Sequence, residues 1–480
     1  MTGSVFISQK ANYASDFGIV NRSSTIFYFV QGGGKQTTVS FMNYWQEKNN
    51  LSTLIIASVR NMSGDLVFRE QLNFEKGSVI NYSPRFSETV FEGSIEIETF
   101  ATVNLRIPYS AIVAVYKYPR SQSMVHSYSR VYSPHEVEEG RIITDGEESC
   151  WTIRDKEGFR SVGVFHNGTI PQVAQTAVLE VINSSNNSWS FEVDLPSLSP
   201  YETIKLYPSD HFLGLPEFLD GQPGNASVSF KTGNSFTRML VGNESVDGSE
   251  FQITHSNFNY SKHITDQLSK SDTAYMNVPQ FTMGQTEVVV YPDSSPGEYQ
   301  AEGDGFEVTF ESGQRVMLPG NEQVIRFTRK DGVFPTRLVT GLSGKITNAE
   351  VQLPFEISLG VHHSERPPSR SRWGLVATDD VLRSRIVVHD LDYLYGGIGN
   401  EQLEFLLFSA TSKLPMRTRV DPLQLMDVGS DTFIDDIFPE AHDFLSGELG
   451  HYFVRPNYGG LMIYSTLEGP NGSMTTEHCF

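Results

Sequence analysis

Four histidines recur at comparable places along the chain, and they are the first candidates for chemistry. Each lies at the end of one of four similar parts of the sequence: His126, His255, His362 and His478. An imidazole can bind ligands or protons, so one hypothesis is a recurrent ligand site. The alternative, which the repetition favours, is a structural histidine duplicated together with its surroundings. One histidine in each part is too few for zinc, which needs three or four convergent ligands, so we expect no metal and no cofactor.

The first histidine begins the run His126-Ser-Tyr-Ser-Arg130. Tyr128 and Arg130 are therefore candidate ligand-binding residues together with His126. The order of strand, turn, strand and this run resembles small β-sandwich proteins of the sensory-rhodopsin-transducer type. The resemblance covers only these few residues and implies no function.

A second cluster combines two adjacent histidines with arginines and a tryptophan. Its candidate ligand-binding residues are His362, His363, Arg370, Arg372 and Trp373. Forked guanidinium groups and a flat indole suit an anion or an acidic sugar. The alternative, which we favour, is a connection between two domains that is stiffened by Pro367 and Pro368.

Tryptophans are scarce, and two of them precede predicted strands at similar positions. Trp151 and Trp373 could serve as stacking platforms, because an aromatic face complements the C–H face of a sugar. Repeated aromatic residues at a rim would also suit multivalent binding. The similar positions nevertheless favour a structural role, and Trp151 is retained as a candidate ligand-binding residue.

Familiar catalytic motifs do not occur in the sequence. It contains no Gly-x-Ser-x-Gly, no His-Glu-x-x-His, no P-loop and no Gly-x-Gly-x-x-Gly before a helix. The acidic pair Asp435 and Asp436 lacks the alternating oxygen ligands and the glycine of a calcium loop. We therefore predict no catalytic residue, although the many carboxylates leave a glycosidase pair open.

Length, charge and cysteine content limit the possible classes of protein. The 480 residues correspond to about three or four domains. With 36 Lys+Arg against 57 Asp+Glu, the net charge of −21 argues against nucleic-acid partners and anionic membranes. Two cysteines exclude a disulfide scaffold. Because no signal peptide or apolar run of about 20 residues is visible, we expect no membrane insertion and a cytoplasmic or virion-associated protein.

Short alternating segments dominate the chain and predict an all-β protein. Ser24–Val30, Thr53–Val59 and Ser94–Phe100 are typical, rich in β-branched and aromatic residues and bounded by turn-forming residues. Helical periodicity is limited to single turns such as Leu215–Asp220. Many short strands with frequent turns favour sandwiches or barrels.

The chain also repeats itself at a spacing of about 120 residues. Phe444-Leu-Ser-Gly-Glu-Leu-Gly450 corresponds to Phe218-Leu-Asp-Gly-Gln-Pro-Gly224, and the features that follow keep the same order. Two further parts fit more loosely. We therefore predict four tandem related β-sandwich units, Ig-like or jelly-roll-like. Their boundaries are 1–137, 138–262, 263–370 and 371–480, and the third unit is the most divergent.

Repetition without a unique chemical cluster suits binding or scaffolding better than catalysis. We expect a non-catalytic β-sandwich protein whose partner is a carbohydrate or another protein. One alternative is a virion or cell-surface assembly component. Another is a carbohydrate-active enzyme whose site lies between units. The oligomeric state stays open.

Overall fold

The computed structural model describes most of the chain. The described residues are 21–43, 50–73, 79–86, 90–102, 112–132, 149–232, 238–256, 272–281, 284–292, 297–332, 334, 338–363, 369–425 and 431–479. They form antiparallel sheets joined by turns and a few short helices, as the all-β prediction requires. No helix among them is long and apolar enough to cross a membrane. Four consecutive stretches, 21–132, 149–256, 272–363 and 369–479, are called the first to fourth segments.

The first segment forms one sheet in the order β4-β3-β6-β1-β2-β7-β8, with β5 beside β2. Its strands are β1 (Asn21–Gly32), β2 (Lys35–Met42), β3 (Leu54–Asn61), β4 (Leu66–Leu72), β5 (Val79–Tyr82), β6 (Val90–Ala101), β7 (Ile112–Lys117) and β8 (Gln122–His126). β1 and β2 pair only beside their connecting turn. Gly33 and Gly34 have φ of 62° and 82° there, a region that favours glycine. The glycine run is thus a hairpin turn.

The second segment forms two four-stranded sheets, β13-β10-β15-β16 and β12-β11-β14-β9. Its elements are β9 (Ser149–Ile153), β10 (Phe159–His166), β11 (Gln175–Ile182), β12 (Ser188–Leu195), β13 (Thr203–Leu206), α4 (Pro208–His211), α5 (Leu215–Leu219), β14 (Gly224–Ser229), β15 (Leu240–Ser245) and β16 (Phe251–His255). Both sheets and α5 contribute side chains to one apolar core around Trp151 and Leu179.

The third segment has a five-stranded sheet, β20-β19-β22-β17-β25, and a four-stranded sheet, β21-β18-β23-β24. Its strands are β17 (Thr273–Asn277), β18 (Gly284–Val290), β19 (Glu298–Gly303), β20 (Phe306–Glu311), β21 (Val316–Leu318), β22 (Val324–Arg329), β23 (Val339–Ile346), β24 (Phe355–Gly360) and β25 (His362–His363). Tyr299 and Phe327 of one sheet meet Leu342 and Phe355 of the other in a shared core.

The fourth segment again has two four-stranded sheets, β26-β31-β28-β29 and β30-β27-β32-β33. Its elements are β26 (Arg372–Val376), β27 (Arg383–Asp390), η3 (Asp392–Tyr395), β28 (Leu403–Phe408), β29 (Met416–Val420), α6 (Pro422–Leu425), β30 (Thr432–Phe433), α7 (Ile434–Ile437), α8 (Ala441–Leu445), β31 (Gly450–Arg455), β32 (Leu461–Glu468), η5 (Pro470–Gly472) and β33 (Met474–His478). Phe405 and Ile463 lie in the core between the sheets.

The same strand order recurs in every segment. We number the strands of each segment from 1 to 8 in chain order. Four neighbouring hydrogen-bonded strands, here called a row, then always have the order 4-3-6-1, and a second row has the order 5-2-7-8. In the first segment the two rows are joined at β1 and β2, and in the third β25 is added beside β17.

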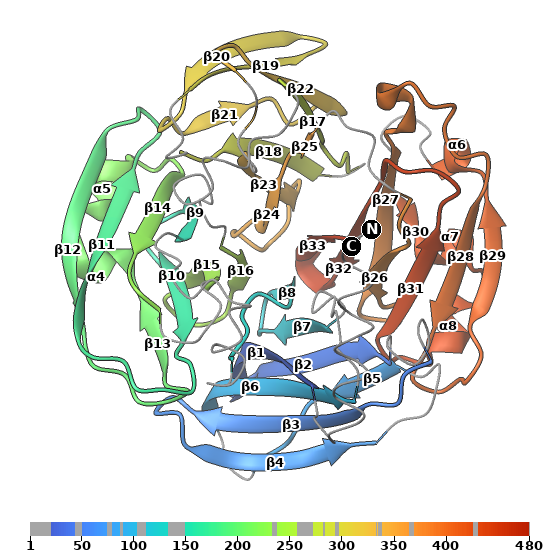
Figure 1. Cartoon of the computed structure of the whole chain (residues 1–480), viewed down its shortest axis with the longest axis horizontal. Coiled ribbons are helices and arrows are strands. Elements are labelled where there is room, and N and C mark those ends of the chain that lie inside the picture. The colour runs from blue at the N-terminus through green and yellow to red at the C-terminus, as the bar shows by residue number, and fades with distance from the viewer. Residues whose placement is uncertain are drawn as a thin grey trace.

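The segments lie around a common centre, and the eighth strand of each segment is nearest to it (Figure 1). β8, β16, β24 and β33 contact one another in this cyclic order, so they surround the centre. Side chains of the first and fourth segments meet around Trp373 and around Met124. The ring is therefore closed between the two ends of the described chain.

Candidate functional site

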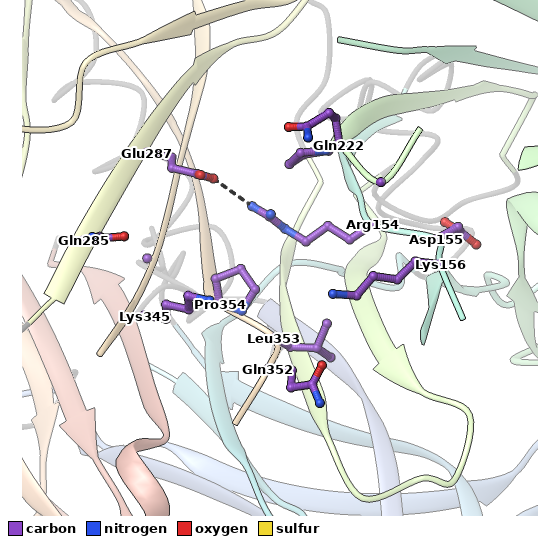
Figure 2. A pocket seen from close by; sticks show the side chains of 13 residues that line it. Arg154, Asp155, Lys156, Gln222, Gln285, Glu287, Lys345, Gln352, Leu353 and Pro354 are labelled. Atoms are coloured by element: carbon purple, nitrogen blue, oxygen red, sulfur yellow. Dashed lines mark hydrogen bonds and ion pairs between the residues drawn. The ribbon is translucent and has the colours of Figure 1, made fainter. Parts of the chain in front are cut away.

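A polar pocket of about 160 Å³ lies between the second and third segments (Figure 2). The residues on its second-segment side include Arg154, Asp155, Lys156 and Gln222. The residues on its third-segment side include Gln285, Glu287, Lys345, Gln352 and Pro354. Charged side chains and amides dominate the pocket wall, and none of the described residues that line it is aromatic.

The register of three neighbouring strands builds one wall of the pocket. Glu287 of β18 lies opposite Ser343 of β23, which in turn lies opposite Glu356 of β24. Residues opposite one another share a face of the sheet, so two carboxylates flank a hydroxyl group. This row faces the loop that follows β9, from which Arg154 extends.

Arg154 joins the two segments through this row. Its Nε donates to Glu356 Oε1 at 2.8 Å. Its Nη2 donates to Ser343 Oγ at 2.8 Å and to Glu287 Oε2 at 3.3 Å. The side chain is only 15% exposed, whereas that of Glu287 is 52% exposed. Arg154 thus fixes the pocket wall, and Glu287 presents an acceptor to solvent.

Burial shifts the pKa values of the ion-paired groups that support the pocket wall. It raises the pKa of Glu356 to about 7, although Arg154 opposes this shift. Burial also disfavours the charge of Arg154, but its two carboxylate partners outweigh that effect and raise its pKa. Lys156 and Lys345 are exposed at the pocket. The pocket can therefore offer ammonium and amide donors beside a carboxylate acceptor.

A second cluster of polar groups lies at the centre of the ring. His126, His255 and His478 are the fifth and last residues of β8, β16 and β33. The ring centroids of His126 and His255 are 4.5 Å apart, and those of His126 and His478 are 5.2 Å apart. The sequence could not show this convergence, because the strands come from three different segments.

Glu477 completes this group, which we call the axial cluster. The axial cluster consists of His126, His255, Glu477 and His478, with one possible ligand atom from each and all of these atoms within 4.8 Å of one another. Glu477 Oε2 lies 3.2 Å from His126 Nδ1. Burial raises the pKa of Glu477, and it lowers that of His255, to which Arg238 adds a further decrease.

The fourth expected histidine does not join the axial cluster. The fifth residue of β24 is Leu359, so His362 is not the counterpart of the other three histidines. His362 and His363 instead form β25, where His362 lies opposite Tyr275 of β17. The sequence also led us to expect too few convergent histidines to bind a metal. That expectation is wrong, because three histidines meet at the axis.

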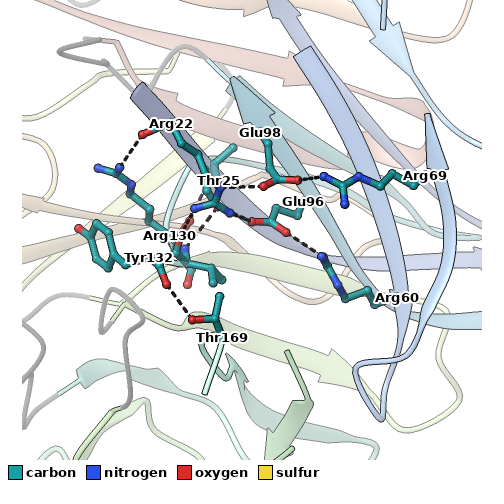
Figure 3. Close-up of polar contacts among 12 residues, drawn as sticks. Arg22, Thr25, Arg60, Arg69, Glu96, Glu98, Arg130, Tyr132 and Thr169 are labelled. Atoms are coloured by element: carbon teal, nitrogen blue, oxygen red, sulfur yellow. Dashed lines mark hydrogen bonds and ion pairs between the residues drawn. The ribbon is translucent and has the colours of Figure 1, made fainter. Parts of the chain in front are cut away.

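Tyr128 belongs to the contact between the first and second segments, and Arg130 contacts other residues of the first segment. Tyr128 is fully buried, and its hydroxyl oxygen lies 2.7 Å from His166 Nε2. Arg130 donates to the carbonyl of Arg22 at 3.3 Å and lies over the ring of Tyr132 (Figure 3). These contacts give both residues structural surroundings rather than a place in the pocket.

The tryptophans chosen from the sequence are also buried. Trp151 is 1% exposed in the core of the second segment. Trp373 is 7% exposed and stacks on Phe453. Arg372 donates from Nε to the carbonyl of Leu461 at 2.8 Å, and Arg370 is exposed. Neither tryptophan offers its face to a sugar.

An aromatic platform does exist, but at a tryptophan that the sequence did not single out. Trp189 of β12 is 54% exposed and stacks on Phe212 with ring centroids 5.6 Å apart. Alternation within β12 was the available signal, since Trp189 and Phe191 share one face of the strand. The pocket residues carried no comparable signal, because they come from loops and strands of two segments.

Comparisons with known proteins place the chain in no family. No family model matches the sequence, and no curated protein matches it. Among solved structures, a glycosyl hydrolase family 2 member from Bacteroides cellulosilyticus DSM 14838 is 8% identical, with 96% of this chain and 92% of that chain covered. Its TM-score of 0.12 supports no conclusion about fold or function.

Proposed function

We propose that the chain is a non-catalytic binding protein built from four related β-sandwich units. The repeated strand order supports this division, since both rows recur in each segment. Apolar packing supports it as well, because in each segment the two rows share a core. The cores of the first and third segments extend to side chains of the second and fourth segments, respectively, so the units also pack against their neighbours. The units correspond to 1–137, 138–262, 263–370 and 371–480. They act as a closed scaffold that holds a ligand pocket between two of its members.

The ligand that fits the pocket best is a carbohydrate, and the composition of the pocket walls carries this proposal. Sugars need donors and acceptors side by side, and amides and charged groups supply both. Gln222, Gln285 and Gln352 lie around the pocket together with Glu287. The two lysines favour a sugar that carries a carboxylate, because an ammonium group bonds to it with charge assistance.

A glycan array probed with the intact chain tests this proposal. We expect binding to acidic glycans, and a loss of at least about tenfold in affinity for Lys345→Ala, because one charge-assisted bond contributes about 1.5–3 kcal/mol. Lys231→Ala is the matched control, since Lys231 is an exposed lysine outside the pocket. Binding to no glycan contradicts the proposal.

The Trp189→Ala variant separates the pocket from the aromatic platform. If the pocket is the site, this variant binds as the wild type does. If Trp189→Ala abolishes binding and Lys345→Ala does not, the carbohydrate site is the platform and the pocket assignment is wrong. Both side chains are exposed, so neither replacement removes part of an apolar core.

A carbohydrate-active enzyme is the second candidate, and one observation favours it. Glu356 has a pKa raised to about 7 by burial, as a general acid requires, and Glu287 lies in the same row of side chains. Arg154 bonds to both carboxylates and competes with such a role. Release of reducing sugar from a bound glycan by the wild type, lost in Glu287→Gln, would establish catalysis.

A further inference from the structure

We propose that the axial cluster binds one zinc ion, or a similar divalent transition-metal ion, at the centre of the ring. Three imidazoles and a carboxylate are a donor set that zinc accepts in four-coordinate sites. The four groups come from three segments of the chain. A metal at this point would connect β8, β16 and β33.

The separations in the axial cluster suit a metal site after a small contraction. At zinc–ligand distances of about 2.0–2.2 Å, ligand atoms of a tetrahedron lie about 3.3–3.6 Å apart. The pair His126 Nδ1 and Glu477 Oε2 is already at 3.2 Å. The pair His478 Nε2 and Glu477 Oε1 is at 3.6 Å. All four ligand atoms lie within 4.8 Å of one another, so the widest pair would move closer by up to about 1.2–1.5 Å when a metal binds.

His255 is oriented as a metal ligand. Its Nδ1 lies 3.0 Å from the carbonyl oxygen of Ser256, so Nδ1 carries the proton and donates it. Its Nε2 is therefore unprotonated, and it is buried without a hydrogen-bond partner among the described residues. A backbone carbonyl behind a ligating histidine is the usual outer contact that fixes the tautomer. A metal ion would use this otherwise unsatisfied lone pair.

The charges around the axial cluster are mixed. Glu477 supplies one negative charge that a cation would compensate. Arg238 lies close enough to His255 to act on its charge, and it weakens cation binding. We therefore expect a site of moderate affinity, in which the three neutral imidazoles supply most of the coordination.

A small cavity adjoins the axial cluster where the first and fourth segments meet. It has a volume of about 10 Å³ and is lined by His126, Trp373, Glu477 and His478 among others. That volume is close to the space needed by one water molecule. With all four positions of the metal taken by protein groups, the role is structural and not catalytic.

Metal analysis of tag-free protein tests the proposal. The chain is purified with zinc, dialysed, and its metal content measured by mass spectrometry. A second sample is treated with chelator and titrated with cobalt(II), whose visible absorption reports tetrahedral coordination. We expect about one metal ion per chain and a tetrahedral cobalt spectrum, in accord with a single four-ligand site.

Two conservative variants and a control make the test specific. His255→Gln and Glu477→Gln each remove a ligand and should weaken zinc binding more than about tenfold. His389→Gln is the control, because His389 is a buried histidine of β27 outside the axial cluster. Circular dichroism shows which variants are folded. Folded wild type without zinc or a cobalt band, or a folded Glu477→Gln with unchanged affinity, overturns the proposal. Glycan binding by the pocket is independent of these results.

Discussion

Replacing His451 with glutamine tests whether a buried neutral histidine makes the contact between the first and fourth segments sensitive to acid. His451 is fully buried on β31, and its Nε2 lies 3.0 Å from Ser40 Oγ of β2. The Ser40 hydroxyl donates its proton to Asn81 Oδ1 at 2.7 Å. The histidine must therefore donate from Nε2, and its Nδ1 is left with a lone pair and no hydrogen-bond partner among the described residues.

The size of the effect follows from the two pKa values. Burial lowers the pKa of His451 to about 3, against about 6.5 in an unfolded chain. The folded pKa is the lower one, so this contribution to stability is complete above pH 6.5 and is lost as the pH falls toward 3. At pH 5.0, about 1.5 units below the pKa of histidine in the unfolded chain, protonation stabilises the unfolded state by about 2 kcal/mol. The free energy of unfolding falls by the same amount.

Urea unfolding of wild type and His451→Gln at pH 7.5 and pH 5.0 measures this difference. Glutamine keeps an N–H donor for Ser40 but does not titrate. Groups such as Glu356, whose pKa is raised in the folded protein, change the pH dependence of stability in the opposite direction. They are present in both proteins, so their contributions cancel in the comparison. We expect the wild type to lose about 2 kcal/mol more than the variant between the two pH values. His442→Gln, at an exposed histidine, is the control. Equal losses in wild type and His451→Gln would refute the reasoning.

Two further replacements test the charged network and the core of the first two segments. Glu96 is fully buried and bonds to Arg22 and Arg60 at 2.6 and 2.8 Å (Figure 3). Glu96→Ala leaves two guanidinium groups without this partner and should lower the free energy of unfolding by about 3–5 kcal/mol. Glu302→Ala, which removes a half-buried carboxylate paired with Arg326, should change it by about 1 kcal/mol or less. Trp151→Ala should cost about 3–5 kcal/mol in urea unfolding, while a folded Trp151→Phe should bind glycans as the wild type does; a loss of binding with unchanged stability would restore Trp151 as a ligand-contacting residue.

Local patterns predicted the strands and the turns because they depend on neighbouring residues alone. The alternation of Ser94–Phe100 gave part of β6, and the single helical turn expected at Leu215–Asp220 is α5. The repeat also placed His126, His255 and His478 correctly at equivalent strand ends, but it placed His362 there wrongly. The sequence predicted four tandem units without indicating how they pack together, and each unit was therefore expected to hold a single such histidine. Only the closed arrangement around the axis brings β8, β16 and β33 together.

The two tryptophans show how a shift of one residue changes the surroundings of a side chain. Gly224 lies opposite Ile153, and Gly450 lies opposite Val376. Counting back from these pairs, Trp373 corresponds to Cys150 and not to Trp151. Successive residues of a strand point to opposite faces. Trp151 therefore fills the core of its own segment, whereas the position of Trp373 faces the neighbouring segment.

The side chain at this interface position is large in the fourth segment and small in the second. This difference bears on the pocket between the second and third segments. Trp373 packs with Phe453 and Met42 where the fourth segment meets the first. At the corresponding position Cys150 belongs to a small apolar group, including Tyr291, where the second segment meets the third. The latter interface relies more on the polar contacts of Arg154. A pocket lined by charged and amide groups is consistent with an interface that large apolar side chains fill less completely, and this departure from the repeat is where we place the ligand.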